Sequence, residues 1–331
     1  MTTPPLLLLE LLADRTLNPK AIALHFSPCE DRQLIPLIND ETFTTLTQVF
    51  SCHIPADRSE VLAPETLSAL QEAGCSTITG EEIHKANGIE RPSLPENINW
   101  LSGQWYMATP AKPPVNQTAS RSLELKLLQL VANDAETREI EEVFRRDPVL
   151  AYHLLRLVNS LGSGTNRNVS SFSQAILILG RQQLKRWLNL MLFAANRNDH
   201  RSAMLMARVA VRARSMELLA AANGFDTATC EKAFMVGMFS LLGVLFGLPL
   251  EKVLAPLNLN DTLSAAVLKN SGEIGHLKQI VETAERLDHK ALYPLIEQVT
   301  GLSVDGFNRI TLEAHSWMHG IINGKQESAD A

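Results

Sequence analysis

The segment Ala233-Phe-Met-Val-Gly-Met-Phe-Ser-Leu-Leu-Gly-Val-Leu-Phe-Gly-Leu-Pro-Leu250 contains 18 consecutive uncharged residues between Lys232 and Glu251. A membrane-spanning helix needs about 20 mostly apolar residues, so this segment is marginal by length. Three glycines and a late proline interrupt it. A helix that other helices enclose on all sides has the same composition. The segment therefore predicts the buried centre of a helical bundle, with a membrane span as the less favoured alternative.

Helical patterns surround this segment and dominate residues 122–331. Asp147-Pro148 offers an N-cap followed by proline at the first helical position, and Ser171-Phe-Ser-Gln174 forms a capping box. Apolar periodicity then predicts helices over roughly 181–196, 200–222, 228–247, 261–269, 274–286 and 306–322.

Residues 1–110 have a different pattern and predict a small α/β domain. The apolar run Ile22–Phe26 and the segment Gly74–Gly80 predict short strands, while 41–50 and 64–73 predict helices. This part is too short for a closed eight-stranded barrel of about 250 residues. The polar, proline-containing stretch 111–121 predicts a linker to the helical domain over 122–331.

Charge and cysteine content limit the possible functions. The net charge is −6, and residues 1–120 hold 7 basic and 14 acidic residues, a balance of −7. An acidic first region makes a nucleic-acid partner unlikely. The four cysteines include no CxxC pair, and the start lacks a basic signal-peptide region. Isolated thiols of this kind predict a cytoplasmic protein.

A basic run over residues 181–214 is the main candidate binding surface. Its eight arginines and lysines face a single acidic residue, Asp199. Arginine side chains suit oxyanions because their guanidinium donors form two parallel hydrogen bonds. The alternative is a solvated helix face balanced by acidic residues elsewhere. The candidates for an anion or partner surface are Arg181, Lys185, Arg201, Arg208 and Arg212.

Other motifs for catalysis are weak. His315 and His319 are four residues apart, which is the spacing of two metal-binding imidazoles on one helix face. The glutamate of a zinc protease is missing between them, so a structural role is favoured. The chain contains no G-x-S-x-G elbow and no glycine-rich phosphate loop. We therefore predict no catalytic, metal-binding or cofactor-binding residues and no cofactor.

Four motifs in order resemble the HDOD family, the output-type relatives of the HD and HD-GYP phosphohydrolases. The similarity covers residues 122–290 and implies an HD-like multi-helix bundle, so the whole chain is predicted to be mainly α. The motifs are Arg145-Arg-Asp-Pro-Val-Leu-Ala-Tyr-His-Leu-Leu-Arg-Leu-Val-Asn-Ser160, Ser170-Ser-Phe-Ser-Gln-Ala-Ile-Leu-Ile-Leu-Gly180 with Leu184-Lys-Arg-Trp187, Arg212-Ala-Arg-Ser-Met-Glu217, and Ala233–Gly243.

The last motif decides what the resemblance implies about catalysis. In catalytic HD relatives this helix contains a His-Asp pair that holds the metal. At the corresponding positions this chain has Ser240 and Leu241. A hydroxyl and an isobutyl group cannot replace an imidazole and a carboxylate as ligands. The dipeptide His-Asp occurs nowhere in the chain. The resemblance thus implies a degenerate metal site and a protein that is not an enzyme.

Residues 1–110 resemble the end of an EAL domain, a barrel that hydrolyses cyclic di-GMP in active members. The similarity rests on Trp100-Leu-Ser-Gly-Gln-Trp-Tyr-Met-Ala-Thr-Pro110. Glu10-Leu-Leu12 has the E-x-L form but lies near the start, and no complete set of acidic ligands follows it. This resemblance implies a shortened, inactive remnant.

The favoured functional hypothesis is a non-catalytic signalling scaffold that binds other signalling proteins, with a homodimer as a further possibility and no membrane contact. The first alternative is a sensor that binds a nucleotide or another anion at the basic surface of residues 181–214. The second alternative is a divergent phosphohydrolase that uses His315 and His319.

Overall fold

The structure is a computed structural model and describes three parts of the chain. These are residues 4–108 except 89 and 93, a few positions between 126 and 140, and residues 199–323 except 256–258 and 260. Several predicted features lie outside the described residues: Arg181, Lys185, the linker 111–121, the helix over 181–196 and the motifs between 145 and 187.

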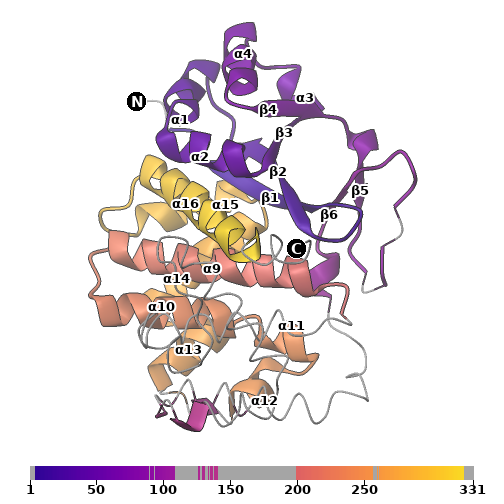
Figure 1. Cartoon of the computed structure of the whole chain (residues 1–331). Helices are drawn as coiled ribbons and strands as arrows, with labels where there is room; N and C mark the ends of the chain where they lie inside the picture. Colours follow the sequence, from indigo (N-terminus) through magenta and orange to yellow (C-terminus); the bar gives the residue numbers. More distant parts are fainter. Residues whose placement is uncertain are drawn as a thin grey trace, which may run out of the picture.

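The N-terminal region contains one six-stranded sheet in the order β4-β3-β2-β1-β6-β5. β1 is antiparallel to β2 and β6, while β2, β3 and β4 run parallel, as do β5 and β6. Figure 1 shows the sheet curling so that β5 and β6 lie across from β3 and β4. The strands are β1 (Leu7–Ala13), β2 (Pro19–Phe26), β3 (Ser51–Pro55), β4 (Cys75–Ile78), β5 (Ile83–Lys85) and β6 (Trp100–Ser102).

Short helices cover the outer face of this sheet and confirm the predicted helices near 41–50 and 64–73. Asp40 begins α2 because its carboxylate accepts the Thr42 N–H, and Pro64 begins α4 at a position that needs no donor. The elements are η1 (Asp31–Leu34), α1 (Ile35–Ile38), α2 (Glu41–Val49), α3 (Ala56–Ser59), α4 (Pro64–Glu72), η2 (Gly80–Glu82) and η3 (Trp105–Met107). The structure therefore fits a small α/β region.

The C-terminal region is helical throughout its described residues. α9 lies at its centre, is buried on most of its surface, and packs against α10, α14 and α16 (Figure 1). The helices are α9 (Ser202–Ala222), α10 (Thr227–Phe239), α11 (Leu242–Phe246), α12 (Leu250–Leu254), α13 (Asp261–Lys269), α14 (Gly272–Glu285), α15 (His289–Glu297) and α16 (Val304–Asn323). These bounds confirm the helices predicted over 200–222, 261–269, 274–286 and 306–322.

Most of the apolar segment of residues 233–250 is buried, while Leu248 and Pro249 near its end are exposed. The stretch Thr227–Phe246 is long and apolar enough to cross a membrane by composition, and 61% of an 18-residue apolar part of it is buried. Its helix is interrupted at Ser240, whose hydroxyl donates to the Gly237 carbonyl. A Cβ atom on Gly237 would lie 2.7 Å from the Cα atom of Ala213, so glycine permits the close crossing of α10 and α9. These contacts support the buried-core interpretation.

The sheet and the helices share one hydrophobic core. Asn308 of α16 ties them together, because its Oδ1 accepts the Leu7 N–H (2.9 Å) and its Nδ2 donates to the Pro5 carbonyl (2.8 Å). Tyr293 of α15 donates its hydroxyl to the Pro4 carbonyl (2.9 Å). The first strand is therefore fixed on the C-terminal helices.

Candidate functional site

A cavity of about 700 Å³ lies where the curled sheet meets α9 and α14. Its sheet side is formed by residues at and just after the ends of the parallel strands β5 and β6, which is where open α/β sheets bind ligands. The volume is in the range of small-molecule sites. The lining residues are Glu10, Lys85, Asn87, Gly103, Gln104, Tyr106, Met107, Arg208, Arg212, Glu282, Glu285, Arg286 and Leu287.

Backbone hydrogen bonds fix the polar groups on the sheet side. The Gly103 N–H donates to Glu10 Oε1 (3.4 Å), and the Gln104 N–H donates to Asn87 Oδ1 (3.1 Å). Gly103 has a φ of +93°, and a Cβ atom there would lie 2.2 Å from the Ala86 carbonyl oxygen. Glycine is therefore required where these two chain segments meet.

Glu10 is an ionised carboxylate on this wall. Its Oε2 lies 3.2 Å from His25 Nε2. Burial alone would raise the pKa of Glu10, but His25, the Gly103 amide and Lys85 together hold it below its ordinary value. The sheet side of the cavity thus presents one negative charge beside Lys85.

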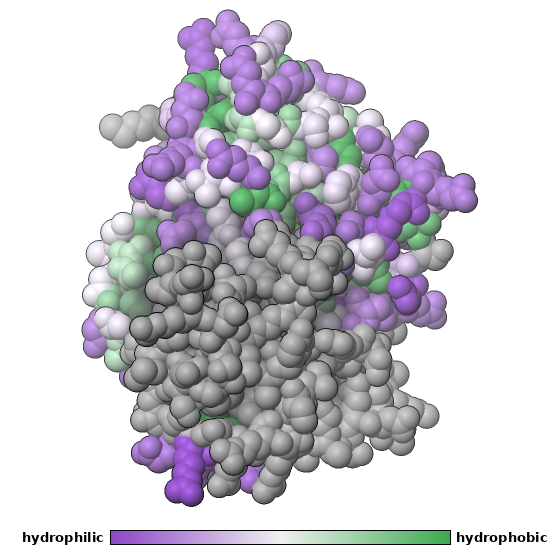
Figure 2. All heavy atoms as spheres, viewed as in Figure 1, coloured by the Kyte–Doolittle hydropathy of each residue, from purple (hydrophilic) through white to green (hydrophobic). Residues whose placement is uncertain are grey.

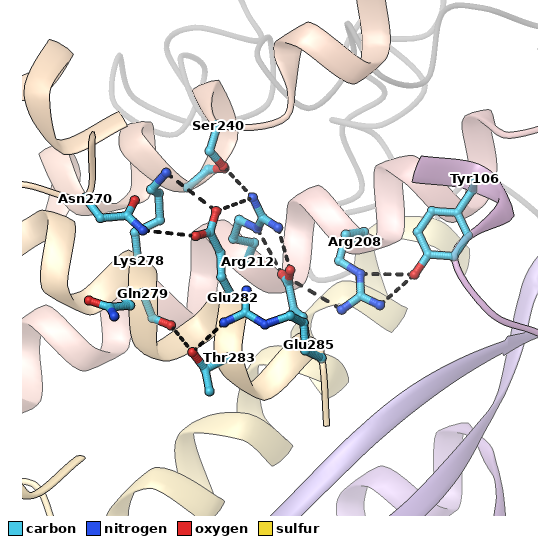
Figure 3. A network of polar contacts seen from close by, with 12 residues as sticks. Tyr106, Arg208, Arg212, Ser240, Asn270, Lys278, Gln279, Glu282, Thr283 and Glu285 are labelled. Carbon is cyan, nitrogen blue, oxygen red and sulfur yellow. Dashed lines mark hydrogen bonds and ion pairs between the residues drawn. The ribbon is translucent and has the colours of Figure 1, made fainter. Parts of the chain in front are cut away.

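The helical side is dominated by an arginine–carboxylate network, drawn in Figure 3. Arg212 pairs with Glu285 through two hydrogen bonds, one of them 2.9 Å from Nε to Oε1. Its Nη1 also donates to Ser240 Oγ (2.8 Å) and lies 3.4 Å from Glu282 Oε1. The charges of Arg212 and Arg208 keep the pKa of Glu285 low although burial would raise it.

Arg208 has fewer charged partners than Arg212. Its Nε and Nη2 both donate to the Tyr106 hydroxyl, at 3.1 and 2.6 Å, and its Nη1 lies 3.8 Å from Glu285 Oε1. Burial would lower the pKa of Arg208, but Tyr106 and Glu285 raise it, so the group stays charged. Arg208 therefore shares a carboxylate that Arg212 already binds at shorter range.

Lys278 and Glu282 extend the network along α14, and Glu282 also lines the cavity. Lys278 Nζ donates to the Val267 carbonyl (2.6 Å) and lies 3.5 Å from Glu282 Oε1. Burial and the charge of Arg212 lower the pKa of Lys278, while Glu282 opposes this. Among the described residues, Arg208, Arg212 and Lys278 form ion pairs with Glu282 and Glu285, and the charge of Glu10 also acts on Arg208.

The structure corrects the prediction of a basic surface. Arg201, Arg208 and Arg212 do lie along α9 and its start, but all three are buried rather than exposed on a solvated face. Arg201 is 2% exposed and binds both carboxylate oxygens of Asp199. The sequence shows helical spacing but not that helices enclose α9 on all sides. Arg208 and Arg212 line the cavity, so these two of the five candidates come together.

Ser240 and Leu241 lie at the end of α10. Ser240 Oγ accepts from Arg212, and Leu241 is 2% exposed. At the two positions where the HDOD resemblance places metal ligands, the structure therefore has a serine bound to the Arg212 guanidinium and a buried leucine. No cluster of three or more His, Cys, Asp or Glu residues that could hold a metal occurs among the described residues.

The two candidate histidines lie in different surroundings. His315 is buried, and its Nδ1 donates to the Thr311 carbonyl (2.8 Å). Burial lowers its pKa to about 4. His319 packs edge-on against Phe50, with 4.9 Å between ring centroids.

Most of the cavity residues were missed by sequence reasoning. Tyr106 belongs to the EAL-like motif but was not assigned a role. Glu282 and Glu285 lie more than 70 residues from Arg208, so only the fold brings them together. Glu282 and Glu285 lie near the end of α14, and their sequence pattern does not distinguish this segment from a solvated helix face.

Comparisons with known proteins identify the domain. Residues 118–256 match the model of the HDOD domain. An uncharacterized protein of Bacillus subtilis, YuxH, is 27% identical over 203 residues, which is 60% of this chain and 48% of that protein. The cyclic di-GMP phosphodiesterase CdgJ of Vibrio cholerae is 28% identical over 182 residues, 55% of this chain and 41% of that protein. The chain thus spans about half or less of each relative.

A crystal structure from Shewanella amazonensis, provisionally described as a phosphohydrolase, covers 62% of this chain and 93% of its own, with 16% identity and a TM-score of 0.41. That likeness is too distant to carry an argument.

The relatives correct one prediction. A protein named as a phosphodiesterase overturns the prediction that this chain is not an enzyme. The prediction rested mainly on the missing metal ligands at Ser240 and Leu241. That loss concerns the HD metal site alone and does not exclude chemistry at other sites in the chain. What the comparisons confirm is an HDOD domain within this chain, over residues 118–256.

Proposed function

We propose that this chain is a signalling protein that binds the phosphodiester of a cyclic dinucleotide in the cavity between the sheet and the helices. The proposal combines a cationic cavity with a relative that is named as a cyclic di-GMP phosphodiesterase. In this proposal the anion binds in the cavity at Arg208 and Arg212, and not on an exposed helix face.

The charge balance of the network is the observation that supports this proposal most. Arg208, Arg212 and Lys278 are each less than 10% exposed, and among the described residues their ion pairs within 4 Å are with Glu282 and Glu285, while Glu10 acts on Arg208 from farther away. A buried charge is costly unless it is paired. Arg208 lies farther from Glu285 than Arg212 does, and it faces the cavity. An anion bound in the cavity would therefore give Arg208 a closer charged partner.

Two further cations make the cavity suitable for an extended anion. Lys85 lies on the sheet side and Arg286 on the helical side. An arginine fork binds two oxygens of one phosphate group, whereas lysine acts as a point charge. Glu10, Glu282 and Glu285 on the same walls disfavour a ligand of high charge density. A phosphodiester with one charge per phosphate fits this mixture.

The metal of catalytic HD proteins does not fit the residues found here. The Ser240 hydroxyl donates a hydrogen bond to the Gly237 carbonyl and accepts one from Arg212. The Leu241 side chain has no atom that can bind a metal. We therefore derive no step through a metal at this position. Cleavage of the ligand is measured directly instead, because the Vibrio relative is named as a hydrolytic enzyme.

The remaining predictions concern organisation and partners. We propose that residues 1–110 are an EAL-like remnant, which the curled sheet with parallel strands supports. Four further points stay predictions: the cytoplasmic location, the degenerate metal site, binding to other signalling proteins, and the division into residues 1–110, 111–121 and 122–331. The exposed large apolar side chains among the described residues are Val61 and Leu248, which lie in different parts of the chain. Hydrophilic residues dominate the outer N-terminal surface in Figure 2.

Calorimetric titration with cyclic di-GMP tests the proposal, together with chromatographic detection of cleavage products. The wild type should bind, and Arg208→Gln should weaken binding about tenfold or more because a charged hydrogen-bond pair is worth about 1.5–3 kcal/mol. Arg309→Gln is the matched control, since Arg309 pairs with Asp40 far from the cavity and is 61% exposed. Absence of binding by the wild type, or equal binding by Arg208→Gln, would refute the cavity as the site.

A further inference from the structure

A row of four side chains crosses the inner face of the curled sheet. The strand register pairs Glu10 with Ala23, Ala23 with His53, and His53 with Ser76. Because side chains alternate between faces, this row lies opposite the face that carries Ile22 and Cys52 into the main core. The row starts at the cavity, which Glu10 lines, and leads away from it across β2 and β3.

His53 has a fixed ring with one unused nitrogen. Its Nδ1 lies 2.8 Å from Ser76 Oγ. Its Nε2 is buried and has no hydrogen-bond partner among the described residues. Buried polar atoms in proteins nearly always have a partner. Burial also lowers the pKa of His53, so the ring is neutral at pH 7 and offers one donor and one acceptor nitrogen.

Trp100 lies beside this histidine on a separate apolar base. Its ring centroid is 5.3 Å from that of His53, with the planes tilted by 53°. Trp100 packs over Leu12, Ala21 and Ala23, a small cluster distinct from the main core, and stays partly exposed. An indole held on one side and partly open on the other is the kind of surface on which nucleobases stack.

We propose that Trp100 and His53 form a nucleobase subsite, where the base stacks on the indole and bonds to His53 Nε2. This inference rests on the proposed function, because the phosphate of the same ligand would lie in the cavity beside Glu10, Lys85 and Arg208. Glu10 and His53 are two strands apart, about 10 Å at the usual strand spacing. A single nucleotide unit can bridge that span, so the ligand is a nucleotide and not a simple phosphate.

Titrations with cyclic guanosine monophosphate and with ribose cyclic phosphate separate the two subsites, because both are singly charged phosphodiesters and only the first carries a base. His53→Ala and Trp100→Leu should each weaken binding of the nucleotide about tenfold and leave binding of ribose cyclic phosphate unchanged within about twofold. Trp100→Phe should retain most of the nucleotide affinity, which guards against a folding defect. His289→Ala at the start of α15 is the control for a histidine outside the site.

The outcomes distinguish the inference from the function on which it rests. Equal loss of both ligands in His53→Ala, or no loss of either, would overturn the nucleobase subsite, while binding of ribose cyclic phosphate by the wild type keeps the cavity as a phosphodiester site. If the wild type binds neither anion, the proposed function fails. Guanosine alone then decides the subsite: saturable binding that His53→Ala abolishes supports it, and no binding overturns it.

Discussion

Arg201 and Arg208 are seven residues apart on one side of the same helical segment, yet their surroundings differ. Arg201 binds both oxygens of Asp199 and also donates to the Ala108 carbonyl. Arg208 donates to the neutral Tyr106 hydroxyl and lies 3.8 Å from a carboxylate that Arg212 holds. Both are buried and charged, so charge and spacing alone do not identify a binding residue. The difference lies in whether the fold supplies a carboxylate of its own.

The largest effect should follow from removal of the shared carboxylate. Glu285→Gln leaves Arg212 and Arg208 buried without their main counter-charge and should lower the free energy of unfolding by about 3–5 kcal/mol. Urea unfolding measures this. Glu297→Gln, at an exposed position at the end of α15, is the control and should change stability by less than about 0.5 kcal/mol. A loss below about 1 kcal/mol for Glu285→Gln would show that the network is not buried as described.

The pH dependence of stability gives the next largest effect, through His315. The folded pKa is about 4, against 6.5 for the free side chain. Between these values the unfolded chain binds the extra proton, so stability from this residue is complete above pH 6.5 and is lost as the pH falls toward 4. At about 1.4 kcal/mol per pKa unit the loss is on the order of 3 kcal/mol.

His315→Asn tests that contribution, because asparagine keeps an N–H donor for the Thr311 carbonyl and does not titrate. Arg208 and Glu285 face His315 and remain in both proteins, so their effects cancel in the comparison. The free energy of unfolding of the variant should fall less than that of the wild type between pH 6.5 and 4. Parallel curves would mean that His315 titrates normally.

The comparison of the two arginines can be tested by Arg201→Gln. This change breaks the bidentate contact with Asp199 and should cost about 2 kcal/mol of stability. Affinity for cyclic di-GMP should stay within about twofold of the wild type, because Arg201 already has its own carboxylate. A loss of affinity as large as that of Arg208→Gln would remove the distinction between them.

The smallest effect concerns the Tyr106 hydroxyl. Tyr106→Phe removes the neutral acceptor of Arg208 and should cost about 1 kcal/mol of stability. Two guanidinium donors are then released toward the cavity, so affinity for cyclic di-GMP should rise slightly or stay equal. A marked fall in affinity by calorimetry would instead make Tyr106 a ligand-binding residue.

Local patterns explain why parts of the fold were predictable from the sequence. Apolar periodicity located α9, α13, α14 and α16, and the apolar segment around Gly237 proved to be an interior helix. The helix α15 was missed, and it contains Pro294, a residue that normally ends helices. The break at Ser240 was missed because one hydroxyl contact, invisible in the periodicity, ends α10.

The candidate site was less predictable because it depends on distant contacts. The sequence located Arg208 and Arg212, but the pairing with Glu285 spans 73 residues and Tyr106 is 102 residues from Arg208. The row from Glu10 to Ser76 follows from strand order and register, which sequence patterns do not specify. Whether a basic residue is exposed or enclosed is a property of the packed structure.

A structure of the chain with cyclic di-GMP tests the central claim most directly. The account predicts a phosphate group within hydrogen-bond distance of the Arg208 guanidinium, in the cavity between the sheet and α14, while Arg201 keeps its contact with Asp199. A ligand bound elsewhere, with the Arg208–Tyr106 contact unchanged and the cavity free of phosphate, would contradict it.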